Sequence, residues 1–571
     1  MKVYYLFIVQ CLLGTILFSQ SYRFQWGQSF GSSSAEAGNC MRTDSKDDVL
    51  TLGYFRSTID FDSGSEELIL KSNGSTDVFL TKMNSSGKLI WAISIGGKQQ
   101  DQGISMALDK EDNIYITGTF QEAIDFNSVL PGVKITAQAF NDIFLAKLNS
   151  DGKLLWVKSF QGSLDDISKS IAIDKDNNIL LCAYFQGTFK LDSDSSLVNF
   201  SSKGGDDISI MKLDNEGNFI WAKHMGGRLD DDPLGIAVDK NNNVIVCGTF
   251  NDTIDIDPGP GRLLFKEKGN IDAFFIKLNQ DGEMIWARQQ ASEELMNAAG
   301  IAIDSRNNLI ITGTFRSKAD FNPGPGEFFM TAPGVSGDSY VLKLDEDANF
   351  IWAIQIGASR NENSIGLALD KEDNIYTTGC YQFKVDFDPG PEEFFLYSDT
   401  ENNNDIYVSS LRPNGNFRWA HGMNGPASDI GFSVAVDNDL GVYSTGIFGK
   451  TLNIGFNPDS VKLVSNGFED IFIHKISQIA SGDEFLSGSD DVLLYPNPVT
   501  GQFPVLLESE SPVHSIEIIN QSGIVEYFKN FGLHTLRNIN LNENFQLPNG
   551  VYFVKVITDN AKIIKKLIVL N

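Results

Sequence analysis

Basic side chains are scarce in this chain of 571 residues. Its 45 Lys and Arg residues stand against 74 Asp and Glu residues, which gives a formal net charge of −29. Nucleic acids and anionic membranes are bound through clustered Lys and Arg that neutralise their phosphates. We therefore expect no nucleic-acid partner and no binding to an anionic membrane surface.

Long hydrophobic stretches are absent after the first twenty residues. Met1 and Lys2 precede an apolar stretch from Val3 to Phe18, which is followed by Ser19 and Gln20. A charged start, an apolar segment and a small residue at a cleavage point are typical of a secretory signal peptide. We predict that residues 1–19 are a signal peptide and that no transmembrane segment remains after its removal.

Cysteine and histidine are rare, with five residues of each. No Cys-x-x-Cys pair and no His-Glu-x-x-His sequence occurs, so the two most recognisable zinc motifs are excluded. Cys11 leaves with the signal peptide. We expect the other four cysteines to be buried and unpaired, since they fall in different copies of the repeat described next: Cys40, Cys182, Cys247 and Cys380.

A regular spacing of aromatic residues is the most conspicuous feature that the chain does have. Its seven Trp residues lie 65 to 67 positions apart: Trp26, Trp91, Trp156, Trp221, Trp286, Trp352 and Trp419. A second series has the same steps: Phe55, Phe120, Phe185, Phe250, Phe315, Tyr381 and Phe448. Seven copies of one unit therefore fill residues 20–480.

One copy contains four predicted strands and almost no helical periodicity. The strands are 104–109, 114–120, 142–148 and 153–160, separated by Asp, Asn and Gly turns and one long loop. The seventh copy ends after its third strand, and the missing fourth strand lies at the other end of the chain, at 22–30. We predict an all-β fold, a seven-bladed β-propeller of four-stranded blades, closed by the N-terminal strand.

The repeat has a recognisable sequence motif. A Trp-Ala-x-x-x-Gly-Gly start occurs at 91–97 and 221–227, and the core reads Asp-x-x-x-Asn-Ile-Tyr-Ile-Thr-Gly-Thr-Phe. This unit resembles the SBBP-type β-propeller repeats of exported bacterial proteins. The resemblance implies the fold and leaves the function open, because propellers serve as enzymes, lectins and scaffolds.

The composition changes after a Gly-, Ser- and Asp-rich linker at residues 481–491. Residues 492–571 contain six acidic and six basic side chains, and we expect them to form a small β-sandwich. Their opening Tyr495-Pro496-Asn497-Pro498, the Gly-Val-Tyr-Phe strand at 550–553 and the basic-then-apolar end resemble the type A sorting domain of the type IX secretion system of the Bacteroidetes. The resemblance implies that the secretion machinery is a partner and that the protein is secreted or displayed on the outer membrane.

Catalytic motifs are weak against the background of the repeat. Gly-x-Ser-x-Gly at 27–31 matches a nucleophile elbow, but the next copy has Ala-x-Ser-x-Gly in the same place on an outer strand. We therefore expect no nucleophile at Ser29. His224 and His421 also fall on outer strands, where we expect surface side chains. No catalytic residue is predicted.

An acidic series follows the repeat. Eight residues before the Asp that ends each first strand, six of the seven copies carry a carboxylate: Glu36, Asp101, Asp166, Asp231, Glu362 and Asp429. Met296 occupies the remaining position. We predict that this acidic ring circles one mouth of the propeller channel, where it binds a ligand or serves the structure.

The long loops carry a second acidic repeat next to Pro-Gly turns. Its residues are Asp60, Asp62, Asp255, Asp257, Asp320, Asp386 and Asp388. Alternating oxygen ligands suit Ca²⁺, although no complete EF-hand loop is present. The alternative is a set of turn-forming side chains repeated for structural reasons.

The preferred functional interpretation is a monomeric, non-enzymatic binding or adhesion module with an unknown extracellular ligand, carbohydrate or another surface polymer. An extracellular hydrolase or lyase that uses ring carboxylates is the alternative, because two suitably spaced carboxylates suffice for glycoside chemistry. A purely structural surface protein is the third hypothesis. Since an active site usually breaks a repeat, blade five, which holds Met296, is the first place to search.

Overall fold

The computed structural model describes residues 22–64, 66–191, 198–334, 336–358, 360–400, 402–455 and 461–478, and parts of the C-terminal region between 492 and 570. The predicted signal peptide, the linker 481–491 and Pro496, Asn497 and Pro498 lie outside the described residues. Every described element is a β-strand, so no helix among these residues is long and apolar enough to span a membrane. The chain divides into two compact units, of which the larger is 24–477.

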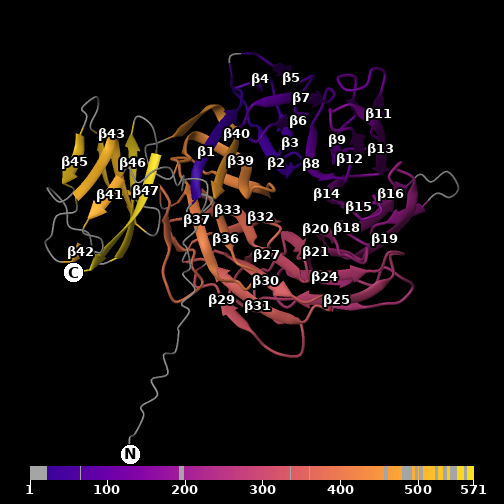
Figure 1. The fold of residues 1–571 in the computed structure, drawn as a ribbon. Helices are drawn as coiled ribbons and strands as arrows, with labels where there is room; N and C mark the ends of the chain where they lie inside the picture. The colour runs from indigo at the N-terminus through magenta and orange to yellow at the C-terminus, as the bar shows by residue number, and fades with distance from the viewer. Residues whose placement is uncertain are drawn as a thin grey trace, which may run out of the picture. The chain divides into compact units, whose positions relative to one another are not determined.

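The larger unit is a seven-bladed β-propeller (Figure 1). From the first strand to the fourth, blade 1 is β2 (Ala37–Thr43), β3 (Val49–Phe55), β6 (Asp77–Met83) and β7 (Leu89–Ile95); blade 2 is β8 (Asp101–Leu108), β9 (Ile114–Phe120), β12 (Asp142–Leu148) and β13 (Leu154–Gly162). Blade 3 is β14 (Asp166–Ile173), β15 (Ile179–Phe185), β18 (Asp207–Leu213) and β19 (Phe219–Gly227); blade 4 is β20 (Asp231–Val238), β21 (Val244–Phe250), β24 (Asp272–Leu278) and β25 (Met284–Gln290); blade 5 is β26 (Gly300–Ile303), β27 (Leu309–Phe315), β30 (Asp338–Leu344) and β31 (Phe350–Ile356). Blade 6 is β32 (Asn363–Leu369), β33 (Ile375–Tyr381), β36 (Asp405–Leu411) and β37 (Phe417–Met423); blade 7 is β38 (Ile430–Val436), β39 (Gly441–Asn453), β40 (Lys462–Gln478) and β1 (Tyr22–Phe30).

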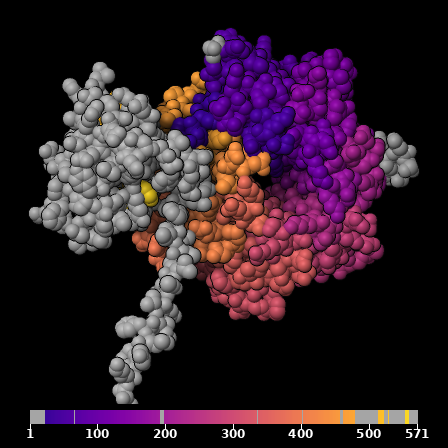
Figure 2. Space-filling model, viewed as in Figure 1, coloured from indigo at the N-terminus to yellow at the C-terminus, as the bar shows by residue number. Residues whose placement is uncertain are grey.

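The first strands of neighbouring blades contact one another, so they form the inner wall of the ring. Figure 2 shows the propeller hollowed at its centre, between the indigo and orange blades. In blades 1 to 6 the loop between the second and third strands contains an extra hairpin. These hairpins are β4 (Thr58–Asp60) with β5 (Ile69–Lys71), β10 (Ala123–Asp125) with β11 (Lys134–Thr136), β16 (Thr188–Leu191) with β17 (Val198–Ser201), β22 (Thr253–Asp255) with β23 (Leu264–Lys266), β28 (Lys318–Asp320) with β29 (Phe329–Thr331), and β34 (Lys384–Asp386) with β35 (Phe395–Tyr397).

The N-terminal strand closes the ring, as the sequence predicts. β1 pairs with β40 and completes the sheet β1-β40-β39-β38. The Gln25 side chain also donates to the Ser477 hydroxyl at 2.6 Å. Blade 7 is also joined to blade 1, because the Asn438 backbone N–H donates to the Asp47 side chain at 2.9 Å. Closure leaves no blade with an open side face.

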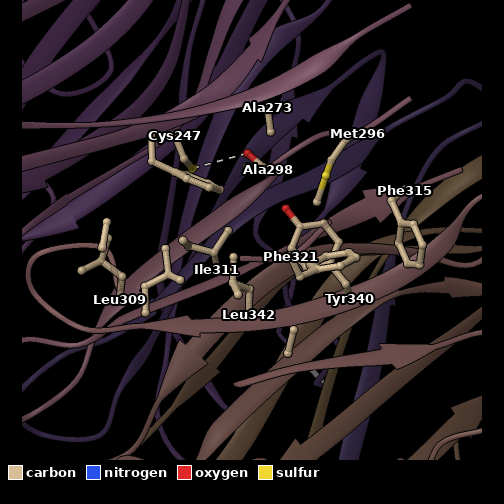
Figure 3. Close-up of a cluster of buried hydrophobic side chains, with 14 of the residues drawn as sticks. Cys247, Ala273, Met296, Ala298, Leu309, Ile311, Phe315, Phe321, Tyr340 and Leu342 are labelled. Atoms are coloured by element: carbon tan, nitrogen blue, oxygen red, sulfur yellow. Dashed lines mark hydrogen bonds between the residues drawn. The ribbon is translucent and has the colours of Figure 1, made fainter. Parts of the chain in front are cut away.

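The hydrophobic core lies between blades rather than inside any one of them. One cluster joins Cys247 and Phe275 of blade 4 to Met296, Phe315 and Tyr340 of blade 5 (Figure 3). The third strands of blades 1 to 6 are buried along their whole length because both of their faces are covered by neighbouring sheets. The four described cysteines are free and buried, as expected.

The repeated Trp residues tie each blade to the next. The Trp221 indole N–H donates to the Gln280 carbonyl in the following blade at 2.9 Å. Its ring lies against Gly282, which has φ +77° in the turn of that blade, and a Cβ at Gly282 would lie 3.0 Å from the indole. Glycine favours this backbone conformation and leaves space for the ring, although Ala348 adopts φ +62° at the equivalent turn of blade 5.

A buried ion pair lies near the inner end of most blades, between the Asp that ends the first strand and a Lys on the third. The Lys–Asp distances are 2.6 Å for Lys82–Asp44, 3.0 Å for Lys212–Asp174, 2.9 Å for Lys277–Asp239, 2.8 Å for Lys343–Asp304 and 3.1 Å for Lys475–Asp437. Burial alone would raise the pKa of Asp174, but hydrogen bonds from Asn178 and Lys212 hold it below its usual value. The Asp174 carboxylate is therefore ionised, and Lys212 compensates its charge.

In blade 6 a different residue supplies the cation that pairs with the buried Asp. Ser410 stands where the other blades have Lys, and Arg418 on the fourth strand supplies the cation instead, 4.0 Å from Asp370 and 3.0 Å from the Ser410 hydroxyl. The positions equivalent to Arg418 in blades 1 to 5 hold exposed aliphatic residues: Ile90, Leu155, Ile220, Ile285 and Ile351. The exchange keeps the buried charge paired.

One expectation about histidine is wrong. His421 is 4% exposed rather than on the surface, because its ring is stacked on His474 between blades 6 and 7, with ring centroids 5.3 Å apart. Burial lowers the pKa of His421 to about 4. His224 is partly buried and lies 2.6 Å from the carboxylate of Asp207.

The described strands of the C-terminal unit form one sheet. Its order is β41 (Val492–Tyr495), β43 (Leu506–Asn520), β46 (Gly550–Thr558), β47 (Lys562–Leu570) and β42 (Val499–Thr500), and β44 (Val525–Asn530) and β45 (Leu536–Asn540) also pair with β43. The described parts of this unit do not test whether it forms the predicted β-sandwich, which stays a prediction.

The cation exchange in blade 6 generates a rescue experiment. Arg418→Ile should destabilise the propeller by about 3–5 kcal/mol, because Asp370 would remain buried without a cation. Adding Ser410→Lys should recover most of that loss by restoring the Lys of the other blades. Urea unfolding followed by Trp fluorescence measures both variants. Ile220→Ala, at the equivalent position of blade 3, is the control, and a double variant no more stable than Arg418→Ile would contradict this role of Arg418.

Candidate functional site

The acidic ring lies inside the protein rather than at an open channel mouth. The side chains of Glu36, Asp101, Asp166, Asp231, Glu362 and Asp429 are each 1% exposed or less. They stand at or just before the start of the first strand of each blade. Backbone N–H groups hold them inward: Gly97 donates to Asp101 at 2.6 Å, and Ala358 donates to Glu362 at 3.0 Å. The ring residues are thus buried, and ligand binding by them at the channel mouth stays a prediction.

A second ring of carboxyl groups, which was not predicted from the sequence, faces the first. Its members begin or lie on the third strands: Asp77, Asp142, Asp207, Asp272, Asp338, Asp405 and Asp470. All seven are fully buried. The sequence contained the signal, because these aspartates follow the same 65- to 67-residue steps as the Trp residues.

The two rings meet in pairs at the junctions between blades. The Gly162 N–H donates to Asp142 at 3.3 Å, and a Cβ on the same glycine would lie 2.3 Å from the Asp166 carboxylate. Gly425 lies in the same way between Asp405, which accepts its N–H at 2.8 Å, and Asp429. Six junctions hold such a pair: Asp77–Asp101, Asp142–Asp166, Asp207–Asp231, Asp338–Glu362, Asp405–Asp429 and Asp470–Glu36.

The first glycine of the Trp-Ala-x-x-x-Gly-Gly sequence makes room for these groups. A Cβ at Gly96 would lie 2.2 Å from the Asp77 carboxyl carbon, and one at Gly226 would lie 2.2 Å from that of Asp207. Blades 1, 3, 5 and 7 have glycine at this position, whereas blades 2, 4 and 6 have Gln161, Ala291 and Asn424. In the four blades with glycine, a side chain could be added only if the buried carboxyl group moved.

Burial raises the pKa of three first-ring aspartates, and repulsion from the partner carboxyl group adds to this rise. The pKa of Asp101 is raised to about 8, that of Asp166 to about 9 and that of Asp231 to about 8. In the second ring, burial raises the pKa of Asp77 and of Asp338 to about 6. A pair that ionises fully is therefore unfavourable at neutral pH.

The loop aspartates brace the hairpins through their hydrogen bonds. Asp60 accepts the backbone N–H groups of Asp62 and Leu68 at 3.0 and 2.9 Å. Asp320 and Asp386 make the same two bonds in their own loops, and Asp255 makes the second of them. Asp62, Asp257 and Asp388 each accept the N–H of the glycine two residues later.

Calcium binding by these loops stays a prediction. Within the described ranges, no group of three or more His, Cys, Asp or Glu side chains has an arrangement that would hold a metal ion. The turn bonds occupy one oxygen of each aspartate and account for the repetition of the motif without an ion.

A cavity of about 290 Å³ lies at the inner ends of blades 1, 2 and 7. Asp44, Asp109, Lys110 and Asn438 are among its lining residues. Bonds between turns bridge the blades here: the Ser45 hydroxyl donates to Asp112 at 2.6 Å, and the Lys110 ammonium donates to the Lys175 carbonyl at 2.7 Å. These bonds occupy polar groups at the rim of the cavity.

Exposed aromatic rings gather on the hairpins of blades 5 and 6. Phe328, Phe329, Phe383 and Tyr397 are 39%, 48%, 45% and 59% exposed. The Lys318 ammonium lies 3.9 Å above the ring of Phe329, and the Lys384 ammonium lies 3.4 Å above that of Phe395. The position of Phe329 holds Ile69, Lys134 or Leu264 in other hairpins, so the repeat changes character at these two neighbouring blades.

Comparison with known families identifies the C-terminal unit. Residues 493–570 match the model of the secretion system C-terminal sorting domain. This unit is a type IX sorting domain. The sorting domain marks the protein for export through the type IX secretion system, to the cell surface or the extracellular space. The aspartate rings, cavity and aromatic rings described above all lie in the propeller, outside the match.

Two curated proteins resemble the chain at low identity. An uncharacterized WD repeat-containing protein of Acanthamoeba polyphaga mimivirus is 24% identical over 514 residues, which covers 74% of this chain and 36% of that protein. The regulatory protein FlaEY of Caulobacter vibrioides is 23% identical over 216 residues, covering 37% of this chain and 22% of that protein. The chain thus spans 36% and 22% of the length of these relatives.

Solved structures give similarly distant matches. A protein of unknown function from Bacteroides caccae has a TM-score of 0.31 at 10% identity, covering 68% of this chain and 94% of that one. The Pan2 WD40 domain of Neurospora crassa has a TM-score of 0.25 at 11% identity, covering 65% of this chain and 88% of that one. The propeller assignment depends on the strand pairing of this chain itself.

The bracing role of the loop aspartates generates a prediction. Asp320→Ala should remove both turn bonds and destabilise the β28–β29 hairpin by about 1–3 kcal/mol. Hydrogen exchange of the hairpin amides should show the loss with and without Ca²⁺. The protein with Asp151→Ala, in a hairpin turn of blade 2, is the control. Protection that depends on Ca²⁺ and disappears in Asp320→Ala would instead establish an ion site.

The sorting domain generates a second prediction. A chain that lacks residues 492–571 should accumulate in the periplasm, because the export signal is gone while the propeller is intact. Immunoblots of periplasmic, surface and medium fractions measure this, with the full chain as the control. Normal surface delivery of the truncated chain would contradict the assignment.

Proposed function

We propose that the propeller is a non-enzymatic binding module, carried outside the cell by the sorting domain, that recognises carbohydrate through the aromatic hairpins of blades 5 and 6. The observation that carries the proposal is the group of exposed aromatic rings on two adjacent blades, Phe328 and Phe329 in blade 5 and Phe383 and Tyr397 in blade 6. Exposed apolar groups gathered in one region mark interaction sites more often than singly scattered ones do.

The chemistry of the rings suits a sugar. An aromatic face carries partial negative charge, which attracts the polarised C–H groups on one face of a pyranose. The ammonium groups of Lys318 and Lys384 already lie over such faces, so these faces accept a positively polarised partner. Both lysines can also donate hydrogen bonds to hydroxyl groups at the edge of a bound ring.

The burial of the acidic ring favours a binding module over a hydrolase. A glycoside hydrolase needs two carboxyl groups that the substrate can reach. The ring carboxylates are 1% exposed or less, and Asp101 and Glu362 accept hydrogen bonds from the backbone N–H groups of Gly97 and Ala358. Their repetition at six junctions supports a role in holding blades together.

A glycan array tests the proposal. The full chain should bind a subset of glycans, and Phe329→Ala with Tyr397→Ala should weaken that binding by about tenfold or more, since each ring contributes about 0.5–1.5 kcal/mol beyond its buried area. Ile69→Ala with Leu264→Ala, in the equivalent hairpins of blades 1 and 4, is the matched control. A blank array with a correctly folded protein would overturn the proposal, as would equal losses in both double variants.

A further inference from the structure

The propeller buries carboxyl groups in two places and treats them differently. At the inner ends of the blades, a Lys or Arg lies beside the Asp, as in Lys212–Asp174 at 3.0 Å. At the blade junctions, two carboxyl groups face each other instead. For the Asp77–Asp101 pair, burial, backbone N–H groups and the other carboxyl group account for the whole electrostatic environment. A different positive charge must therefore compensate this pair.

The hydrogen bonds of the carboxyl oxygens show where the compensating positive charge lies. Asp77 uses Oδ2 to accept the Asn73 N–H at 3.0 Å, and Asp101 uses Oδ2 to accept the Gly97 N–H at 2.6 Å. The Oδ1 atom of each residue is buried without a hydrogen-bond partner. The same is true of Asp338 Oδ1 and Glu362 Oε1 in the junction between blades 5 and 6. A buried oxygen without a partner is strongly unfavourable, so a pair with two such oxygens has one missing hydrogen between two acceptors. In the other three pairs one member already accepts hydrogen bonds on both oxygens: Asp142, Asp405 and Glu36.

We infer that a junction pair with a free oxygen on both carboxyl groups holds one shared proton, donated by one carboxyl group to the free oxygen of the other. Three pairs meet this condition: Asp77–Asp101, Asp207–Asp231 and Asp338–Glu362. The bond that forms is an O–H···O⁻ hydrogen bond, which is among the stronger types in proteins. Each of these pairs then carries a single negative charge. Three such protons lower the magnitude of the formal charge of −29 by about three, entirely within the interior.

A proton fits these junctions better than a divalent cation does. Ca²⁺ requires six to eight oxygen ligands, and the pairs supply two carboxyl groups that are fully or almost fully buried. No third acidic, His or Cys side chain joins a pair to make a metal site within the described residues. A proton needs only the two free oxygens that the pair provides.

Other charged groups change the electrostatic environment of some pairs but not that of Asp77–Asp101. Arg56 lies near Glu36, His224 bonds to Asp207, and Asp399 adds repulsion at the Asp405–Asp429 pair. Asp165 and Asp230 similarly adjoin Asp166 and Asp231. The Asp77–Asp101 pair is therefore the one on which the inference is tested.

One junction has a single carboxyl group. Met296 stands in place of the first carboxyl group at the junction of blades 4 and 5, which leaves Asp272 without a carboxyl partner. The Gln289 side chain donates to Asp272 Oδ2 at 2.7 Å, as Gln355 does to Asp338 Oδ2 in the next blade, and Asp272 Oδ1 is buried without a hydrogen bond. We expect no shared proton at this junction.

The sign of the pH dependence follows from the raised pKa values. The pKa of Asp101 is about 8 in the folded chain, whereas an aspartate in the unfolded chain has a pKa near 4. The native state therefore keeps protons that the unfolded state releases. The stability that the pairs contribute is complete in acid and is lost as the pH rises from about 4 to about 8. The junctions between blades are weakened by alkali.

Proton counting on the full chain tests the inference. Potentiometric titrations of native and urea-unfolded protein give the number of extra protons in the native state at about pH 6, between the unfolded and folded pKa values of Asp101. Asp101→Asn should lower that number by about one, because an amide replaces the protonated partner. Its unfolding constant should also change about tenfold less per pH unit than that of the wild type. Asp77→Asn is the second variant if Asp101→Asn fails to fold.

The controls distinguish the shared proton from a general effect of charge and from a bound cation. Asp62→Asn, which changes a partly exposed aspartate outside any pair, should leave the proton count unchanged. An unchanged count in both Asp101→Asn and Asp77→Asn would overturn the inference, as would an equal drop in Asp62→Asn. Adding Ca²⁺ to chelator-treated protein should leave the count and the melting temperature unchanged, and a Ca²⁺-dependent change that Asp101→Asn abolishes would assign the junction to a cation instead.

Discussion

The packing of each blade against the next is the constraint on which the rest of the structure depends. A four-stranded sheet of this kind has apolar side chains on both faces, and only a neighbour on each side can cover them. The clusters that join Cys247 of blade 4 to Tyr340 of blade 5 are of this type. Because every blade needs two neighbours, the array must close, and the strand from the start of the chain completes the last blade.

Repeated polar contacts hold the same interface in register. Trp221 bonds to the turn of the next blade, and Lys212 contacts the same carbonyl of Gln280. The turn holds glycine in most blades and Ala348 in blade 5, small residues that leave room for the indole. A substitution at this interface is therefore felt by the neighbouring blade.

The acidic character of the chain has two separate origins. Exposed aspartates form turns, as Asp60 and Asp62 do, and are hydrated. A second population is wholly buried, and in the interior an isolated negative charge is unfavourable unless a cation or a proton neutralises it. The propeller uses Lys at one end of its blades and carboxyl pairs at the junctions, so the two ends respond to pH in opposite directions. Departures from the repeat, such as the aromatic hairpins, then stand out as candidates for function.

The sequence by itself determined the number of blades, the order of strands and the sorting domain, because these depend on local patterns: a Trp every 65 to 67 residues, alternating strands, and a motif read in order. The regular spacing of the second-ring aspartates is also present in the sequence, although no second ring was predicted from it. Only the tertiary structure decided that the acidic ring is buried, that Asp101 faces Asp77 and that His421 stacks on His474. Those facts depend on side chains from different blades meeting in space, and spacing along the chain gives no measure of burial or of which residue lies opposite another.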